Sequence, residues 1–174
     1  MAAPALNPKL SGEDHCDGPQ SADLELVMYG DFQCPYCAAA FPIVGKVRER
    51  LAGRLLFAFR HFPLREVHPD AQVAAEGAEA AAAQGAFWPM HDVLYSSRGA
   101  LSVPDLVAHA RELGLDEERV EDELGSGAFA GRVQRDVDSG TSSGVGGTPA
   151  FFVNGRMHEA SFDAGSLMAA LEAG

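Results

Sequence analysis

The sequence predicts an α/β fold in which strand, helix and strand precede an all-helical block, and two strands and a helix follow it. Two apolar β runs, at about 23–30 and 54–64, flank a helical pattern. Nine of the sixteen residues from Ala71 to Ala86 are alanine, a composition typical of helix. A pair of β runs around Asn154-Gly155 then returns near the C-terminus.

The first β run, "DLELVMYG", has Leu24, Leu26 and Met28 at period two, with further apolar residues on its other face. This pattern is that of a buried strand. After the cysteines of "DFQCPYCA", a helix is expected up to Gly53, and Pro42 should kink it. The run "RLLFAFRHFPL" predicts a second strand that Pro63 ends. A right-handed crossover should make the two strands parallel.

The block expected at about 66–140 contains several helix signals. Ser102 is placed as an N-cap, with a proline in the following turn and Gly114 as the end of that helix. Asn154-Gly155 predicts a hairpin, and a last helix is expected from about Asp163 to Ala173. Residues 1–22 show no periodicity and are expected to form a flexible arm. Residues 23–174 are expected to form one domain that carries the helical insertion.

Composition excludes several function classes. The chain has 174 residues, of which 47% are hydrophobic, so it can bury a core. Its net charge of −12 argues against nucleic-acid binding. No segment approaches the roughly 20 apolar residues of a membrane span, and the start lacks the pattern of a signal peptide. We therefore expect a cytoplasmic protein, although an exported form with a removed signal stays open.

The pair Cys34 and Cys37 is the main chemical feature of the sequence. Cys34 is expected where a strand turns into a helix, with Pro35 at the first helical position and Tyr36 after it. The unpaired N–H groups and the dipole of that helix would stabilise a Cys34 thiolate. Cys37, one turn further on and less exposed, can reach back. Such a pair suits disulfide exchange, in which one thiol attacks and the other resolves the mixed disulfide.

The pair has two other interpretations. A zinc site needs two more ligands, and His15 with Cys16 is the nearby candidate. A structural disulfide is the other interpretation, but it would be unusual in a reducing compartment. Cys16 is expected to be a bystander. We expect no metal and no organic cofactor, because the redox equivalents would reside on a Cys34–Cys37 disulfide.

The stretches "YGDFQCPYC" and "GVGGTPAFFVNGR" together resemble the DsbA-like branch of the thioredoxin superfamily. The resemblance covers about residues 22–172 and implies a thioredoxin fold, βαβ…ββα, with a helical insertion. It implies that the Thr148–Pro149 bond is cis and that its loop binds extended substrates. It also implies a thiol–disulfide oxidoreductase that acts on thiols or disulfides of other proteins. Glutathione or a thioredoxin-type partner would reset it.

The chain departs from that family at Met28, where relatives usually carry a glutamate six residues before the first cysteine. Glu25 should point to the other face of the strand, and Asp31 is expected in an exposed turn. The rival functions are a glutathione-dependent transferase or isomerase and a chaperone-like binding module. His61, His68 and His91 are expected at the surface or in packing. A group of large residues is expected mainly in the core, with some members lining a groove beside Cys34: Phe87, Trp88, Met90 and Tyr95.

Overall fold

A five-stranded mixed sheet forms the centre of the computed structural model, which describes residues 2–97 and 99–174. The strands lie in the order β1 (His15–Asp17), β3 (Leu55–His61), β2 (Leu24–Gly30), β4 (Ala150–Val153) and β5 (Arg156–Met157). The central pair, β2 and β3, is parallel, and the other pairings are antiparallel. The expected α/β class and the βαβ…ββα order of the thioredoxin fold are confirmed.

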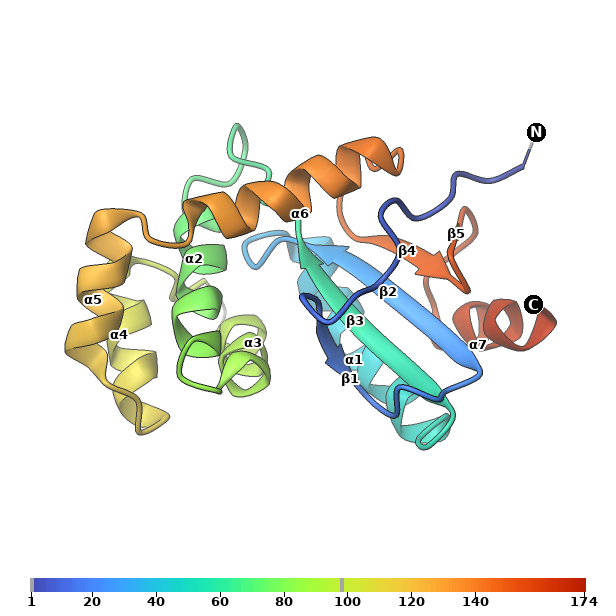
Figure 1. Ribbon diagram of the computed structural model, residues 1–174, viewed down its shortest axis with the longest axis horizontal. Helices are drawn as coiled ribbons and strands as arrows, with labels where there is room; N and C mark the ends of the chain where they lie inside the picture. The colour runs from blue at the N-terminus through green and yellow to red at the C-terminus, as the bar shows by residue number, and fades with distance from the viewer. Residues whose placement is uncertain (1, 98) are drawn as a thin grey trace.

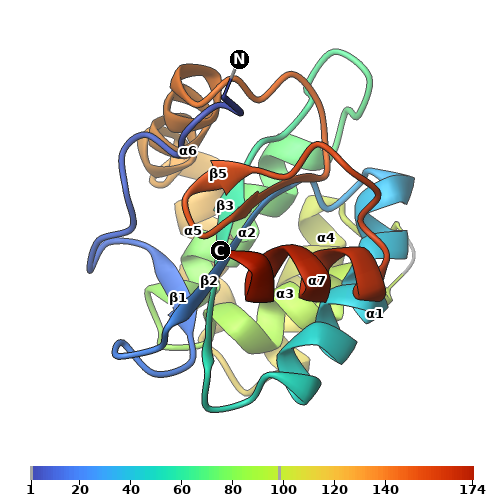
Figure 2. The same ribbon diagram turned by 90° about the vertical axis from the view of Figure 1, so that its right-hand side faces the viewer.

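Helices cover both faces of this sheet (Figure 2). Helices α1 (Pro35–Arg50) and α7 (Ala164–Ala173) lie on one face, which we call the first face, and α6 (Ala130–Ser142) lies on the second. Leu26 and Met28 of β2 point to the first face, whereas Val27 and Tyr29 belong to the core of the second face. Burial on both faces explains why β2 and β3 have near-continuous apolar sequences. Helix α1 continues through Pro42.

The helical block lies to one side of the sheet (Figure 1). It contains α2 (Ala71–Ala82), α3 (Phe87–Ser96), α4 (Val103–Glu112) and α5 (Glu117–Ser126), and α6 leads from it back to the sheet. Ser102 caps α4 as predicted, in a capping box with Asp105. These helices place α3 against the face of α1 that carries the cysteine pair.

The turn between β4 and β5 is the predicted two-residue hairpin. Asn154 and Gly155 both have left-handed backbone angles, with φ of 48° and 82°. The Asn154 side chain also accepts a hydrogen bond from the Glu25 N–H at 2.9 Å and donates one to the Leu171 carbonyl at 3.0 Å. The hairpin is therefore tied to both β2 and α7.

The N-terminal segment differs from the flexible arm that the sequence predicted for residues 1–22. Residues 15–17 form β1, paired with β3 at one edge of the sheet, and Ala5 pairs with Arg156 at the other edge. Between these points the segment crosses the second face (Figure 1), and Leu6 is buried there. The expectation failed because a three-residue edge strand, "HCD", is held by backbone hydrogen bonds and needs no apolar alternation.

Among the described residues, we found no helix with the length and apolar character that crossing a membrane requires.

Candidate active site

Cys34 is the N-cap of α1 and lies directly after the turn that follows β2. Its backbone is extended, with φ −72° and ψ 122°, and Pro35 occupies the first helical position. The side chain therefore lies beside the N-terminal end of α1, where backbone N–H groups lack intrahelical partners. Cys34 is 3% exposed, more buried than the sequence suggested. It lines a cavity of about 280 Å³ between the active-site turn and α3.

The Cys34 sulfur is held in an environment that favours the thiolate. A hydrogen bond from the Cys37 thiol lowers the pKa of Cys34 to about 5, although burial acts in the opposite direction. Backbone N–H groups of Cys37 and Tyr36 lower that pKa further. At neutral pH Cys34 is therefore a thiolate, the form that attacks disulfides.

Cys37 has the opposite character. It is completely buried, three residues further along α1. Burial raises the pKa of Cys37 far above its ordinary range, and the interaction with the Cys34 sulfur raises it further. Both cysteines are free thiols in this structure. The pair thus consists of one stabilised thiolate and one buried, protonated thiol.

The loop before β4 lies next to this pair. The Thr148–Pro149 peptide bond is cis, and the Thr148 carbonyl oxygen lies 3.6 Å from the Cys34 sulfur. Tyr29 of β2 pairs with Ala150, which places this loop beside the turn that carries Cys34. Tyr36 is 67% exposed at the same end of the sheet. The structure therefore brings together the cysteine motif and the loop that the sequence analysis assigned to disulfide exchange: Cys34, Pro35, Tyr36, Cys37, Thr148 and Pro149.

Asp31 organises the turn, and the expectation that it is exposed is wrong: it is 1% exposed. Its Oδ1 accepts hydrogen bonds from the N–H groups of Gln33 at 2.7 Å and Cys34 at 3.1 Å. Its Oδ2 accepts from the Leu64 N–H at 2.9 Å and contacts His68 Nδ1 at 2.7 Å. An aspartate three residues before a helix N-cap is a signal for such local hydrogen bonds, but its partners at 64 and 68 are not visible in the sequence.

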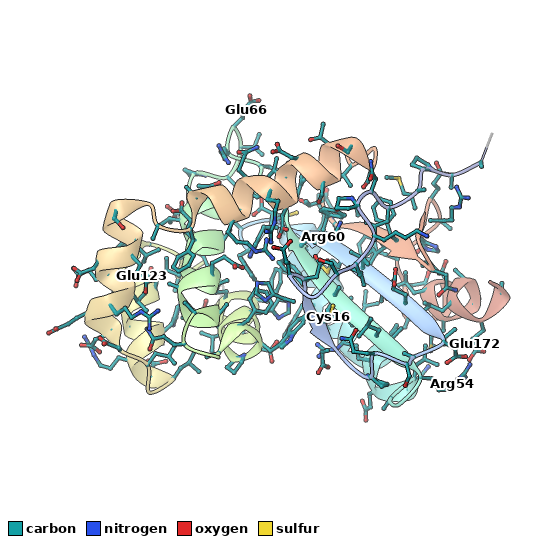
Figure 3. All side chains as sticks on the ribbon, in the orientation of Figure 1. Cys16, Arg54, Arg60, Glu66, Glu123 and Glu172 are labelled. Atoms are coloured by element: carbon teal, nitrogen blue, oxygen red, sulfur yellow. The ribbon has the colours of Figure 1, made fainter. Side chains whose placement is uncertain are left out.

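The third cysteine is remote from this chemistry. Cys16 lies in β1 opposite Ala58 of β3, and Figure 3 shows it near Arg60 on the sheet. Burial raises the pKa of Cys16 to about 11, and the nearby carboxylates of Asp14 and Glu25 contribute. Cys16 is therefore a protonated thiol at neutral pH, which agrees with its expected role as a bystander.

A second polar cluster, which the sequence did not reveal, lies between β1, β3 and α2. Glu79 Oε2 is 2.7 Å from the Nε2 atoms of both His15 and His61, and the three groups are close enough to share a metal ion. The chemistry of the set favours a hydrogen-bonded cluster around the Glu79 carboxylate. Arg132 already lies 3.6 Å from Glu79, and metal on His61 Nε2 would leave a buried Nδ1 proton without an acceptor among the described residues.

The other histidines are partly or fully buried. His61 is fully buried in the cluster with Glu79, and its backbone N–H donates a hydrogen bond to the Asp136 carboxylate at 2.9 Å. His68 contacts Asp31 as described above. His91 is buried among aromatic rings of α3 and β3, as expected for a packing residue, and burial lowers its pKa.

The arrangement of a thiolate at a helix N-terminus, a buried thiol behind it and a cis-proline loop beside it points to one family. The family model described as Thioredoxin matches residues 10–173. The chain belongs to this thioredoxin family. The match includes β1, which agrees with the position of that strand in the sheet.

Several solved structures share the fold of this chain. Oxidised BdbD from Bacillus subtilis superposes with a TM-score of 0.89 at 20% identity, covering 99% of this chain and 98% of that one. A thioredoxin-like oxidoreductase from Silicibacter pomeroyi gives 0.83 at 23% identity, covering 94% and 92%. The α-DsbA1 protein of Wolbachia pipientis gives 0.81 at 16% identity, covering 95% and 92%. At these identities the likeness shows that the chain has the DsbA-like form of the thioredoxin fold.

Curated relatives are more similar in sequence but much longer. The protein named Na⁺/H⁺ antiporter NhaA 1 of Salinispora arenicola is 48% identical over 160 residues, which is 91% of this chain and 24% of the relative. The protein named Na⁺/H⁺ antiporter NhaA of Herminiimonas arsenicoxydans is 42% identical over 170 residues, 98% of this chain and 26% of the relative. The chain thus spans about a quarter of the length of these relatives.

Proposed function

We propose that this thioredoxin-family chain is a thiol–disulfide oxidoreductase that exchanges disulfides with protein substrates through Cys34 and Cys37. The observation that carries the proposal is the placement of the two thiols. Cys34 caps the N-terminus of α1, where its pKa is lowered to about 5, and Cys37 is completely buried, where its pKa is raised far above the ordinary range. One thiol is thereby prepared to attack, and the other is kept protonated until the first has reacted.

In the reducing direction, the Cys34 thiolate attacks one sulfur of a substrate disulfide. The substrate S–S bond breaks, a mixed disulfide to Cys34 forms, and the released substrate thiolate takes up a proton. Cys37 then loses its proton and attacks the Cys34 sulfur, which releases the second substrate thiol and leaves a Cys34–Cys37 disulfide. Two electrons pass from the enzyme to the substrate, and the oxidising direction is the reverse sequence.

The exposed Tyr36 ring and the carbonyl of Thr148 favour a protein substrate over a small one. Tyr36 offers an apolar contact surface beside the reacting sulfur. The loop at Thr148 and Pro149 offers backbone groups to an extended chain, as the family resemblance implies. No cofactor beyond the Cys34–Cys37 disulfide is part of this proposal. Glutathione or a thioredoxin-type protein is proposed as the partner that resets the pair.

The test is the reduction of insulin by the dithiol form, followed as turbidity with dithiothreitol as the source of electrons. Wild-type protein should accelerate precipitation, whereas Cys34→Ser should abolish the acceleration and Cys16→Ser should leave it unchanged. Equal activity of wild type and Cys34→Ser would overturn the proposal. A holdase would instead suppress aggregation of an unfolded protein in both forms, which separates the chaperone-like alternative.

A glutathione-dependent transferase or isomerase on the same fold is the rival enzyme. It would need Cys34 but not Cys37, so Cys37→Ala would keep transferase activity and lose insulin reduction. We propose a cytoplasmic location, and fractionation of cells that express the tagged protein would test it. The proposed activity is that of this chain, which spans about a quarter of the length of its relatives.

A further inference from the structure

Tyr95 of α3 is buried next to the cysteine pair, yet its hydroxyl has no hydrogen-bond partner among the described residues. The Tyr95 ring packs against aromatic rings that precede and follow the cysteine motif in sequence. It lies 4.8 Å from the ring of Phe32, which precedes the cysteines, and 5.5 Å from the ring of Phe41, which follows them on α1. Because a buried hydroxyl without a partner costs free energy, its presence here needs an explanation.

The hydroxyl lies over β2 at Gly30. A Cβ atom added to Gly30 would come 2.7 Å from the Tyr95 oxygen and 2.5 Å from the Phe59 ring. The phenol oxygen thus occupies the place that a side chain at position 30 would fill. Gly30 is two residues after Met28, so positions 28 and 30 share the same face of the strand. This is the face to which Cys37 also belongs.

Met28 is apolar, at the position where the resemblance to the DsbA-like branch implies a glutamate. Met28 is 2% exposed and lines a cavity of about 220 Å³ together with Tyr95 and His91. Tyr95 also lines the separate cavity that contains Cys34. It therefore borders both the space at position 28 and the site of the reacting sulfurs. Its hydroxyl provides a polar group on this side of the core, where Met28 provides none.

We propose a role for Tyr95 in positioning and stabilising Cys37. Its hydroxyl donates a hydrogen bond to the Cys37 sulfur when Cys37 becomes a thiolate. The proposal rests on the proposed function and goes beyond it by assigning this residue a role. While Cys34 is a thiolate, the Cys37 proton is directed to the Cys34 sulfur. Once Cys34 is in a mixed disulfide, that acceptor is lost, and the Cys37 thiolate needs a donor.

The charged and titratable groups around the Tyr95 hydroxyl favour its protonated form, which can donate a hydrogen bond. Burial, followed by the nearby Cys37, Asp31 and Cys34, raises the pKa of Tyr95 well above its ordinary value. The phenol therefore keeps its proton throughout the working range of pH. It donates a hydrogen bond but does not accept the Cys37 proton, which ends on the departing substrate thiol. The other charged or titratable groups at this cavity are the buried His91 on the same helix, the exposed Asp92 and the partly buried Arg48.

The test uses Ellman's reagent, a disulfide that reports each released thiol by its colour. In a Cys16→Ser background, which leaves the two motif thiols, reduced protein should release thionitrobenzoate in two phases under stopped flow. The first is the attack of Cys34, and the second is resolution by Cys37. In Tyr95→Phe the first phase should be unchanged, and the second should slow roughly tenfold or more, the effect of losing one charge-assisted hydrogen bond. The pH at which the second phase reaches half its maximal rate should also rise.

Tyr29→Phe is the matched control, because that buried hydroxyl contacts Ser139 at 2.8 Å and Arg60 at 2.9 Å on the second face. It should leave both phases unchanged. A uniform slowing of Tyr95→Phe at every pH would indicate that Cys37 has merely moved, and would overturn the inference. An unchanged second phase would do the same and leave the proposed function intact. Loss of the first phase in wild type would instead refute the proposed function itself.

Discussion

The carboxylate of Asp31 lies 2.7 Å from the imidazole of His68 and also accepts a hydrogen bond from the backbone N–H of Cys34. One buried side chain thus connects the active-site turn to the loop after β3. Gln33 strengthens the same connection, because its side-chain oxygen accepts the Asp70 N–H at 2.7 Å. The position of the reacting sulfur therefore depends on residues more than thirty positions away.

Replacement of Asp31 by asparagine should destabilise the reduced protein by about 2–3 kcal/mol. The asparagine amide keeps one acceptor oxygen. Its NH₂ group would face backbone N–H groups, which are themselves donors. Urea denaturation should show a lower midpoint. The exposed Asp122 provides the control, since Asp122→Asn should leave the midpoint unchanged. A midpoint for Asp31→Asn equal to that of wild type would show that the network contributes nothing.

Alkylation of Cys34 should follow a titration with a midpoint near pH 5, because the pKa of Cys34 is about 5. Cys16 and Cys37 should react far more slowly below pH 7, since the pKa values of both are raised. Cys37→Ala removes the largest cause of the low pKa, so the Cys34 midpoint should move upward. Mass spectrometry of iodoacetamide-treated protein measures each site. Faster reaction of Cys37 or Cys16 would contradict the assignment of roles.

The redox potential of the pair should fall between those of thioredoxin and the periplasmic oxidase DsbA, about −270 and −120 mV. A thiolate that is more strongly stabilised favours the dithiol and makes the disulfide more oxidising. The Cys34 pKa of about 5 lies between values of roughly 7 and 3.5 for those two proteins. Tyr36 also lacks the imidazole that DsbA offers between its cysteines. Equilibration with glutathione buffers gives the value, and a result outside this window would discard the prediction.

Substitution of Met28 by glutamate should shorten the lifetime of the mixed disulfide at neutral pH. The new carboxylate would lie on the face of β2 that carries Gly30, in the cavity bordered by Tyr95, where it can exchange a proton with Cys37. Quenched flow and non-reducing gels measure the lifetime. Met28→Gln, which is polar but cannot take up a proton, is the control and should not shorten it. Equal lifetimes in wild type and Met28→Glu would mean that the proton already has another path.

His91 should make the protein less stable as the solution becomes acidic. Burial lowers its pKa below the unfolded value of 6.5, with Asp92 acting in the opposite direction. The unfolded chain therefore binds a proton before the folded one, so this contribution is complete above about pH 6.5 and is lost below it. His91→Phe should flatten the decline in the urea midpoint between about pH 7 and pH 5. An equal decline of the urea midpoint with falling pH in wild type and His91→Phe would contradict the assignment of this pH dependence to His91.

Local sequence signals predicted the elements that depend on local chemistry. Ser102, Asn154-Gly155 and Cys34-Pro35 each carry a cap or turn preference that acts within a few residues, and the structure has these caps and turns at those positions. The missed features depend on partners distant in sequence. The polar run "HCD" became a strand because β3 has a free edge, and Asp31 became buried because the loop at 64–68 covers it. Tyr95 was placed with the core residues, and its unpartnered hydroxyl is visible only when β2 is in place.

The path of residues 5–17 across the sheet has a consequence for the two edge strands. A sheet edge offers unpaired backbone groups, to which an extended polypeptide can add as a further strand. Here the backbone of His15–Asp17 occupies the open side of β3, and Ala5 pairs beside β5. The same short segment thus covers backbone groups at both margins of the sheet. A chain that lacked residues 1–22 would expose both margins, and we expect it to aggregate more readily than the full chain.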